Sequence, residues 1–180
     1  MLSQTSIKIQ DCKYCPFQEF DFNKSKELGF GNKYRIMFVG SSPAISSNKS
    51  CGKSKFDLFF NNLLSKVDIS KRDYYFTNLC KTSIPKNLKL TEEQVQHCLS
   101  HLKEEIKEVK PQIIVLLGSI CRDAFWIRYP DKVYNMKIGS LKIKVYPIAH
   151  PGFLHYEPAE EKSYLKKLTK IHKYYKRILI

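Results

Sequence analysis

Four cysteines have a spacing that can hold a metal ion or an iron–sulfur cluster. Cys12 and Cys15 form a Cys-x-x-Cys pair, and Cys80 and Cys98 follow much later in the chain. One local pair of thiolates and two distant ones can enclose a tetrahedral Zn²⁺ or a 4Fe–4S cluster. Buried, inert thiols are the alternative, and Cys98 keeps it open because it lies one position off the apolar stripe of its predicted helix. Spacing alone decides neither whether a metal binds nor which one.

A histidine follows the last predicted strand, in the segment His150-Pro-Gly-Phe-Leu154. At a strand end its imidazole can donate a hydrogen bond to negative charge that develops on a leaving group. The alternative is a structural histidine that precedes a proline turn. The neighbouring Phe153 and Leu154 are either turn hydrophobics or an apolar wedge that enters a base stack.

The loop after the first predicted strand is a second candidate binding element. Its sequence, Gly40-Ser-Ser-Pro-Ala44, can bring backbone N–H groups close to a phosphate or a base. Further along, Gly52-Lys53-Ser54 looks like the end of a P-loop, but that motif requires a glycine where Ser47 stands. The sequence therefore argues against a P-loop nucleoside triphosphatase.

The chain carries a large excess of positive charge. It has 31 Lys and Arg against 17 Asp and Glu, which gives a formal net charge of +14. This excess favours a polyanionic partner such as nucleic acid, because neutralising phosphates releases counterions. A lysine-rich surface that only keeps the protein in solution is the alternative. For the lysines and tyrosines of the C-terminal helix, a phosphate-tracking face and a solvated face remain equally open.

Membrane and export signals are not evident in the sequence. No apolar run approaches the length of a membrane span, and the first residues lack a basic start followed by an apolar stretch. We therefore expect an intracellular, cytoplasmic protein with no membrane partner. In a reducing compartment, the six cysteines favour metal ligands over disulfides.

The elements that must position these residues alternate along the chain. Apolar runs predict strands at Tyr34–Val39, Tyr74–Leu79, Ile113–Leu117 and Leu141–Tyr146. Helical spacing predicts helices near 56–64, after the capping box that Thr91 and Gln94 form, across about 120–127, where Cys121 is expected in the core, and from about Ala159. This order is typical of a parallel sheet with helices on both faces, whose ligands bind beyond the carboxyl ends of the strands. The length of 180 residues suits a single domain over residues 1–180.

Taken in order, these segments resemble the family 4 (thermostable, iron–sulfur) uracil-DNA glycosylases of the uracil-DNA glycosylase superfamily. The matching segments are the early Cys-x-x-Cys, Ile36–Gly40 with Pro43, Gly52–Ser54, Tyr75–Asn78, the helix with Cys98, Lys110–Gly118, and His150–Leu154 with Pro158. The resemblance covers nearly the whole chain. It implies a three-layer α/β/α sandwich around a central, mainly parallel four-stranded sheet.

The resemblance also implies a 4Fe–4S cluster with four cysteine ligands. Cys12, Cys15 and Cys98 match the family directly. The remaining family cysteine falls at Thr82, and we assign Cys80 as the fourth ligand through a local shift of the loop.

The same resemblance gives roles to residues at the strand ends. Asn78 would pair with the edge of a flipped uracil, and His150 would stabilise negative charge on uracil O2 as the N-glycosidic bond breaks. Leu154, or Phe153 beside it, would fill the hole left in the duplex.

The rest of the predicted substrate pocket consists of Gly40, Ser42, Pro43 and Phe56. Ser41 or Ser42 would position a water. The implied partner is DNA, single- or double-stranded, that contains uracil or another damaged base. We expect the protein to be a monomer.

The first motif departs from the family. The family has an acidic residue where Ser41 stands, and its stacking aromatic aligns near Ser50, so Phe56 or Phe59 would have to replace it. A neutral serine cannot act as the carboxylate that activates water. Two hypotheses follow: a DNA repair glycosylase that removes uracil or a bulkier modified pyrimidine, or a non-catalytic iron–sulfur protein that binds DNA. A zinc-bound nucleic-acid protein is a more distant third.

Overall fold

The computed structural model describes residues 12, 29–33, 35–43, 54–82, 84 and 89–178. Within these residues one sheet of six strands has the order β1-β3-β2-β4-β6-β5. The strands are β1 (Phe30–Gly31), β2 (Ile36–Gly40), β3 (Tyr74–Asn78), β4 (Ile113–Leu117), β5 (Tyr134–Ile138) and β6 (Leu141–Ile148). The four central strands pair in parallel, as predicted, while β1 and β5 pair antiparallel at the two edges.

The expectation of a four-stranded sheet is therefore wrong by two edge strands. β1 has only two residues, too few to form a periodic pattern. β5 alternates between half-buried and exposed positions and joins β6 through a hairpin in which Ile138 pairs with Leu141. Gly139 opens that two-residue turn with φ +60°, a conformation that glycine adopts without strain.

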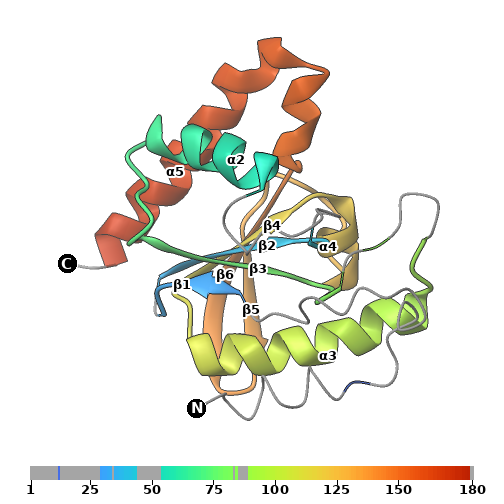
Figure 1. The fold of residues 1–180 in the computed structure, drawn as a ribbon. Coiled ribbons are helices and arrows are strands. Elements are labelled where there is room, and N and C mark those ends of the chain that lie inside the picture. The colour runs from blue at the N-terminus through green and yellow to red at the C-terminus, as the bar shows by residue number, and fades with distance from the viewer. Residues whose placement is uncertain are drawn as a thin grey trace.

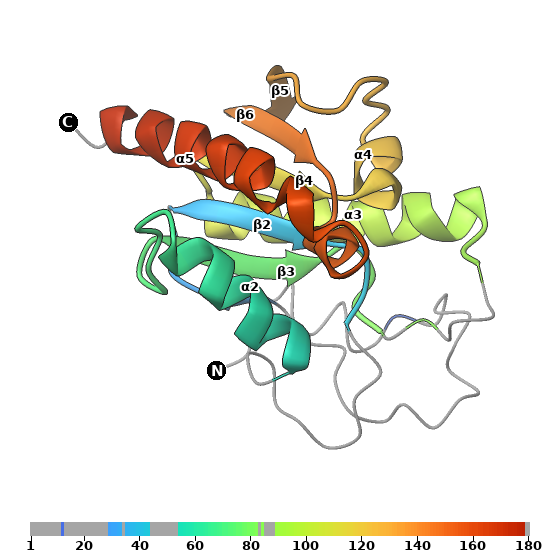
Figure 2. The ribbon, with the colours of Figure 1, turned by 90° about the horizontal axis from the view of Figure 1, so that it is seen from above.

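The sheet lies between two helical layers (Figures 1 and 2). Helices α2 (Lys55–Ser65) and α5 (Glu161–Ile178) cover one face, and α3 (Glu92–Val109) and α4 (Ser119–Ala124) cover the other. Along β2, Ile36 and Phe38 pack under α2 and α5, whereas Met37 and Val39 pack against the α3 side. A strand that is buried on both faces must be apolar at every position, which explains its continuous apolar run.

Capping boxes fix where the two helices next to the site begin. Thr91 accepts a hydrogen bond from the Gln94 backbone N–H, and the Gln94 side chain returns to the Thr91 N–H, as the sequence predicted for α3. Ser54 and Asp57 form the same box at α2. The C-terminal helix begins at Glu161, close to the predicted start, after two short 3₁₀ helices (Pro151–His155 and Pro158–Glu160).

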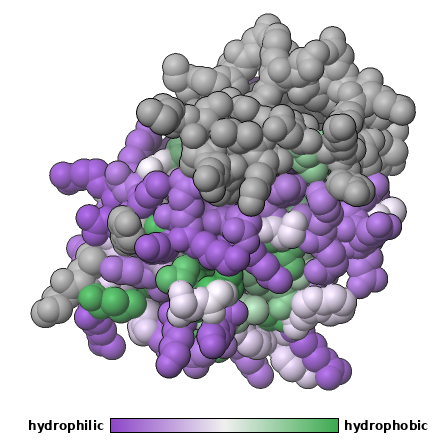
Figure 3. Space-filling model, turned by 90° about the horizontal axis from the view of Figure 1, so that it is seen from below, coloured by the Kyte–Doolittle hydropathy of each residue, from purple (hydrophilic) through white to green (hydrophobic). Residues whose placement is uncertain are grey.

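Among the described residues, hydrophilic side chains make up most of the surface seen from the α3 side (Figure 3). None of the helices in the described part of the chain is long and apolar enough to cross a membrane.

Candidate active site and thiol cluster

The carboxyl ends of β2 and β3 bring Gly40 and Asn78 together. The two residues are partners in the parallel register, and a Cβ placed on Gly40 would lie only 2.6 Å from Asn78 Oδ1. The side-chain amide of Asn78 therefore lies against the backbone of Gly40, where only glycine leaves room. Beyond the strands, the Leu79 and Cys80 N–H groups donate to the carbonyls of Gly40 and Ser41 at 2.8 and 2.9 Å. The first residues of the loops that follow β2 and β3 are thus hydrogen-bonded to each other beyond the strands.

His150 lies just beyond the end of β6 and begins the 3₁₀ helix Pro151–His155. Its Nδ1 accepts a hydrogen bond from the Gly152 N–H at 3.1 Å. We assign the ring proton to Nε2 from this bond, because a nitrogen that accepts cannot also carry the proton. Burial lowers the pKa of His150 below its ordinary value of 6.5, which favours the neutral ring. The imidazole is thus a neutral group with one N–H to donate.

Two further residues pack on His150. The Phe56 ring stacks on the imidazole, with centroids 5.1 Å apart and planes 23° apart. A Cβ on Gly118, which has φ +92°, would lie 3.1 Å from the Cβ of His150. Gly118 was not among the predicted site residues, although a glycine that ends a buried strand is the pattern for such a close approach. Phe56 therefore borders the site, but its predicted role in stacking on a base remains a prediction.

The remaining predicted pocket residues differ in exposure. Ser41, Ser42 and Pro43 are half-buried at the end of β2. Leu154 is only 5% exposed and packs in the core, so in this conformation it offers no side chain to a duplex. Phe153 is half-buried and leaves the wedge role as a prediction for that residue.

Asp57 is the acidic residue nearest in sequence to the altered first motif. Its Oδ2 accepts from the Ser54 N–H at 2.8 Å and from the Ser54 hydroxyl at 2.6 Å. This carboxylate closes the N-terminus of α2, so it does not replace the missing catalytic acid.

Two of the predicted cluster ligands contact each other. Cys80, buried after β3, donates a hydrogen bond from its thiol to Cys98 on α3. That bond, with burial second, raises the pKa of Cys80, and the same bond lowers the pKa of Cys98. Cys121 is fully buried in the core, as predicted, and burial raises its pKa to about 12.

Cys12 lies beside two histidines that the sequence analysis missed. Its Sγ is 3.3 Å from Nε2 of His97, and one ligand atom each from Cys12, His97 and His101 all lie within 4.8 Å of one another. The two histidines are four residues apart on α3, a spacing that places both on one helix face and could have indicated them. Cys15, the other residue of the Cys-x-x-Cys pair, lies outside the described residues.

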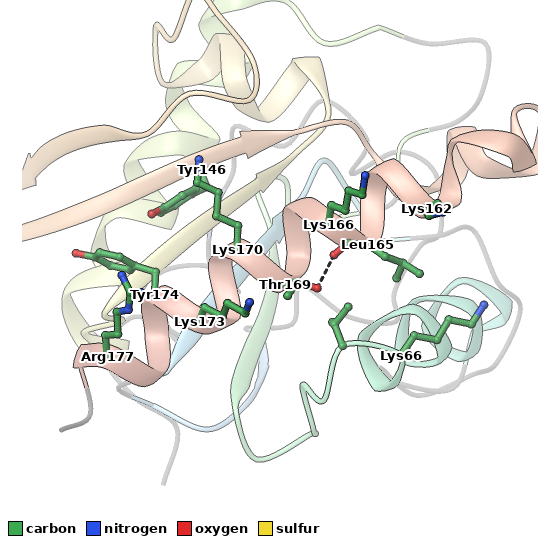
Figure 4. Close-up of a pocket in the computed structure, with 11 residues that line it drawn as sticks. Lys66, Tyr146, Lys162, Leu165, Lys166, Thr169, Lys170, Lys173, Tyr174 and Arg177 are labelled. Carbon is green, nitrogen blue, oxygen red and sulfur yellow. Dashed lines mark hydrogen bonds between the residues drawn. The ribbon is translucent and has the colours of Figure 1, made fainter.

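A basic groove runs between α2, β6 and α5 (Figure 4). Its volume is about 680 Å³, and α5 contributes Lys162, Lys166, Lys170, Lys173 and Arg177 at nearly every turn. The lining also includes Lys66, which follows α2, and the rings of Tyr146 and Tyr174, and none of the described residues that line the groove is acidic. Glu161, at the start of α5, pairs with Lys66 at 2.6 Å. The groove can therefore accept an extended anion.

Comparison with known proteins identifies the family. Residues 28–176 match the family described as the uracil DNA glycosylase superfamily. The chain is 27% identical to a type-4 uracil-DNA glycosylase of Archaeoglobus fulgidus, over 91% of this chain and 88% of that protein. It is 26% identical to a type-4 uracil-DNA glycosylase of Saccharolobus solfataricus, over 91% of this chain and 82% of that protein. A type-5 uracil-DNA glycosylase of Pyrobaculum aerophilum is 34% identical over 68% of this chain and 55% of that protein. Because the family match spans the sheet and both helical layers, this chain belongs to the uracil DNA glycosylase superfamily.

Proposed function

We propose that this protein is a DNA repair glycosylase that flips uracil or a modified pyrimidine out of DNA and hydrolyses its N-glycosidic bond. The observation that carries the proposal is the hydrogen bond from the Gly152 N–H to Nδ1 of His150, which keeps the ring proton on Nε2 at the end of β6. Asn78 ends a strand at the same edge of the sheet and supplies an amide that can both donate to and accept from a base.

Each group has a defined task in the proposed reaction. The Asn78 amide pairs with the edge of the flipped base, and the His150 N–H stabilises the negative charge that collects on O2 as the bond between the sugar C1′ and the base nitrogen breaks. The base leaves as an anion that is then protonated. Water adds to C1′ and loses one proton to solvent, and its other proton stays on the new C1′ hydroxyl. Ser41 or Ser42 can orient that water but cannot take its proton as a carboxylate would.

DNA would extend from the strand edge along the basic groove. The cations on α5 lie one helical turn apart, about 5.4 Å, which suits the repeated charges of a nucleic-acid backbone. This arrangement supports the phosphate-tracking alternative for the C-terminal helix. An intracellular location and a monomeric state belong to the same proposal, since one copy carries Asn78, His150 and the groove.

A 4Fe–4S cluster held by Cys12, Cys15, Cys80 and Cys98 is also part of the proposal. The fit within the described residues is partial: Cys80 and Cys98 are in contact, and Cys12 touches His97, the neighbour of Cys98. When bound, such a cluster would tie the segment after β3 to α3 and the N-terminal segment. The grouping of Cys12 with His97 and His101 favours a second candidate, a zinc ion held by one thiolate and two imidazoles.

The activity is tested with single- and double-stranded oligonucleotides that contain one uracil or one modified pyrimidine. Incubation followed by alkali should cut the strand at the damaged base, and the free base should appear in equal amount. If no such substrate yields product while the protein binds DNA tightly and its binding weakens steeply with salt, the non-catalytic alternative is correct.

A further inference from the structure

An ion pair is buried directly behind the end of β3. Lys81 is 6% exposed and Glu105, on α3, is 1% exposed. We propose that Lys81 and Glu105 are positioning residues that hold Asn78 in the orientation needed to recognise the base. This inference rests on the proposed function, because it assigns the pair to the base-recognition step.

Glu105 is the anchor of this arrangement. Its Oε1 accepts from the Gly29 N–H at 2.8 Å and from the Tyr75 hydroxyl at 2.9 Å, and both oxygens lie 3.0 Å from the Thr77 hydroxyl. Its Oε2 accepts from the Lys81 ammonium. A buried carboxylate is tolerated only when its oxygens are satisfied in this way. One side chain of α3 thus fixes residues before and along β3.

Lys81 links Glu105 to Asn78. Its ammonium donates to the Thr77 hydroxyl at 2.7 Å, to the Asn78 carbonyl at 2.6 Å and to Glu105. An ammonium has three protons, and here each has an acceptor. The Lys81 ammonium therefore cannot move away from the Asn78 carbonyl without breaking its hydrogen bonds to Thr77 and Glu105.

Asn78 is consequently held from two sides. Lys81 holds its backbone carbonyl, and the missing Cβ of Gly40 leaves the space that its side-chain amide occupies. Between these contacts the direction of the amide is set before any base enters. Such preorganisation matters because a displacement of about 1 Å in a positioned group can reduce a rate by roughly 10²-fold.

Exposed ion pairs on the same helix provide matched controls. Glu104 pairs with Lys107, and Glu108 pairs with Lys33, at exposures between 29% and 50%. Glu104→Gln therefore removes one negative charge from α3 while leaving the Lys81–Glu105 pair unchanged.

The first measurement needs no activity. The side-chain NH₂ signals of Asn78 in ¹⁵N-labelled protein, identified by their loss in Asn78→Ala, should shift or broaden in the double variant Lys81→Met with Glu105→Gln. They should stay in place in Glu104→Gln. Removing both charges together avoids an unpaired buried ion. If the double variant does not fold, Lys81→Met alone serves, because Glu105 then keeps its hydrogen bonds from Gly29, Tyr75 and Thr77. Unmoved Asn78 signals in a folded variant would overturn the proposal.

The second measurement is a mutant cycle, in which kcat/KM for uracil-containing DNA is compared with and without the Asn78 side chain. The double variant should lose about 10- to 100-fold in the Asn78 background but less than about threefold more when Asn78 is already alanine, since the pair then has nothing to position. Equal losses in both backgrounds would show a general structural role instead. If the wild-type protein forms no product, the proposed function fails, and the amide signals still decide whether the pair positions Asn78.

Discussion

Asn78 and His150, at the carboxyl ends of the strands, are held by backbone contacts and glycines. The thiol cluster (Cys12, Cys80 and Cys98) is instead held by contacts that its own sulfur atoms make. Asn78 fits over Gly40, and His150 is fixed by the Gly152 N–H. The Cys80 thiol, in contrast, is hydrogen-bonded to Cys98, and Cys12 lies against His97. The fold itself therefore fixes the positions of Asn78 and His150. The thiol cluster presents donors whose final arrangement depends on what binds them, so the two regions should respond differently to substitution.

The largest effect is expected at His150. His150→Ala should lower kcat by about 10²- to 10³-fold, because the proposed donor to the developing anion is removed. His155→Ala is the control, since His155 ends the 3₁₀ helix that follows His150 and its exposed ring packs on Phe59. Single-turnover assays on uracil-containing DNA measure the difference. Equal rates for the two variants would break the assignment of His150.

Gly40→Ala tests whether the edge is set by close packing. The new Cβ would lie 2.6 Å from Asn78 Oδ1, so the amide must move and kcat/KM should fall by about 10- to 100-fold. The melting temperature, measured in parallel, separates this from general destabilisation. Full activity in Gly40→Ala would mean that the amide of Asn78 does not need its position over Gly40.

The thiol cluster should respond through its metal content. In protein purified without oxygen, Cys98→Ser and Cys80→Ser should lose iron and the absorbance at about 400 nm expected of thiolate–iron bonds. Cys121→Ser should keep both, because Cys121 belongs to the core. If zinc is found instead, and His97→Ala loses it while Cys80→Ser does not, the four-cysteine prediction is wrong and the mixed thiolate–imidazole site is correct.

The pH dependence should be smaller and should come from the strand edge. Burial lowers the pKa of His150, so the ring stays neutral below pH 6.5. The value of kcat should fall only as pH drops through the depressed folded-state pKa, where a proton on Nδ1 breaks the hydrogen bond from the Gly152 N–H that orients the ring. The same shift makes the unfolded state bind the proton first, so stability should decrease as pH falls below 6.5 and level off beneath the folded-state pKa. An acidic limb centred above 6.5 would contradict the buried, neutral ring.

The smallest effect concerns the basic groove. Lys170→Gln and Lys173→Gln should each reduce the slope of log K against log[salt] for DNA by about one. Lys137→Gln and Lys142→Gln, on the β5–β6 hairpin, are the controls. If groove and hairpin variants change the slope equally, the lysines of α5 form a solvated face.

The sequence alone determined the central strands, the α3 capping box and the edge of the sheet where Asn78 and His150 lie. These features depend on residues near one another in the chain, where an apolar run or a cap pattern is sufficient. Tertiary structure decided the edge strands, the burial of Leu154, the engagement of Asp57 in a cap and the pairing of Lys81 with Glu105. The last pair illustrates the reason: the two residues are 24 positions apart, and only the packing of α3 against β3 brings them into contact. A glutamate three residues after Leu102 on an apolar helix face indicates burial, but its partner depends on which strand lies beneath that face.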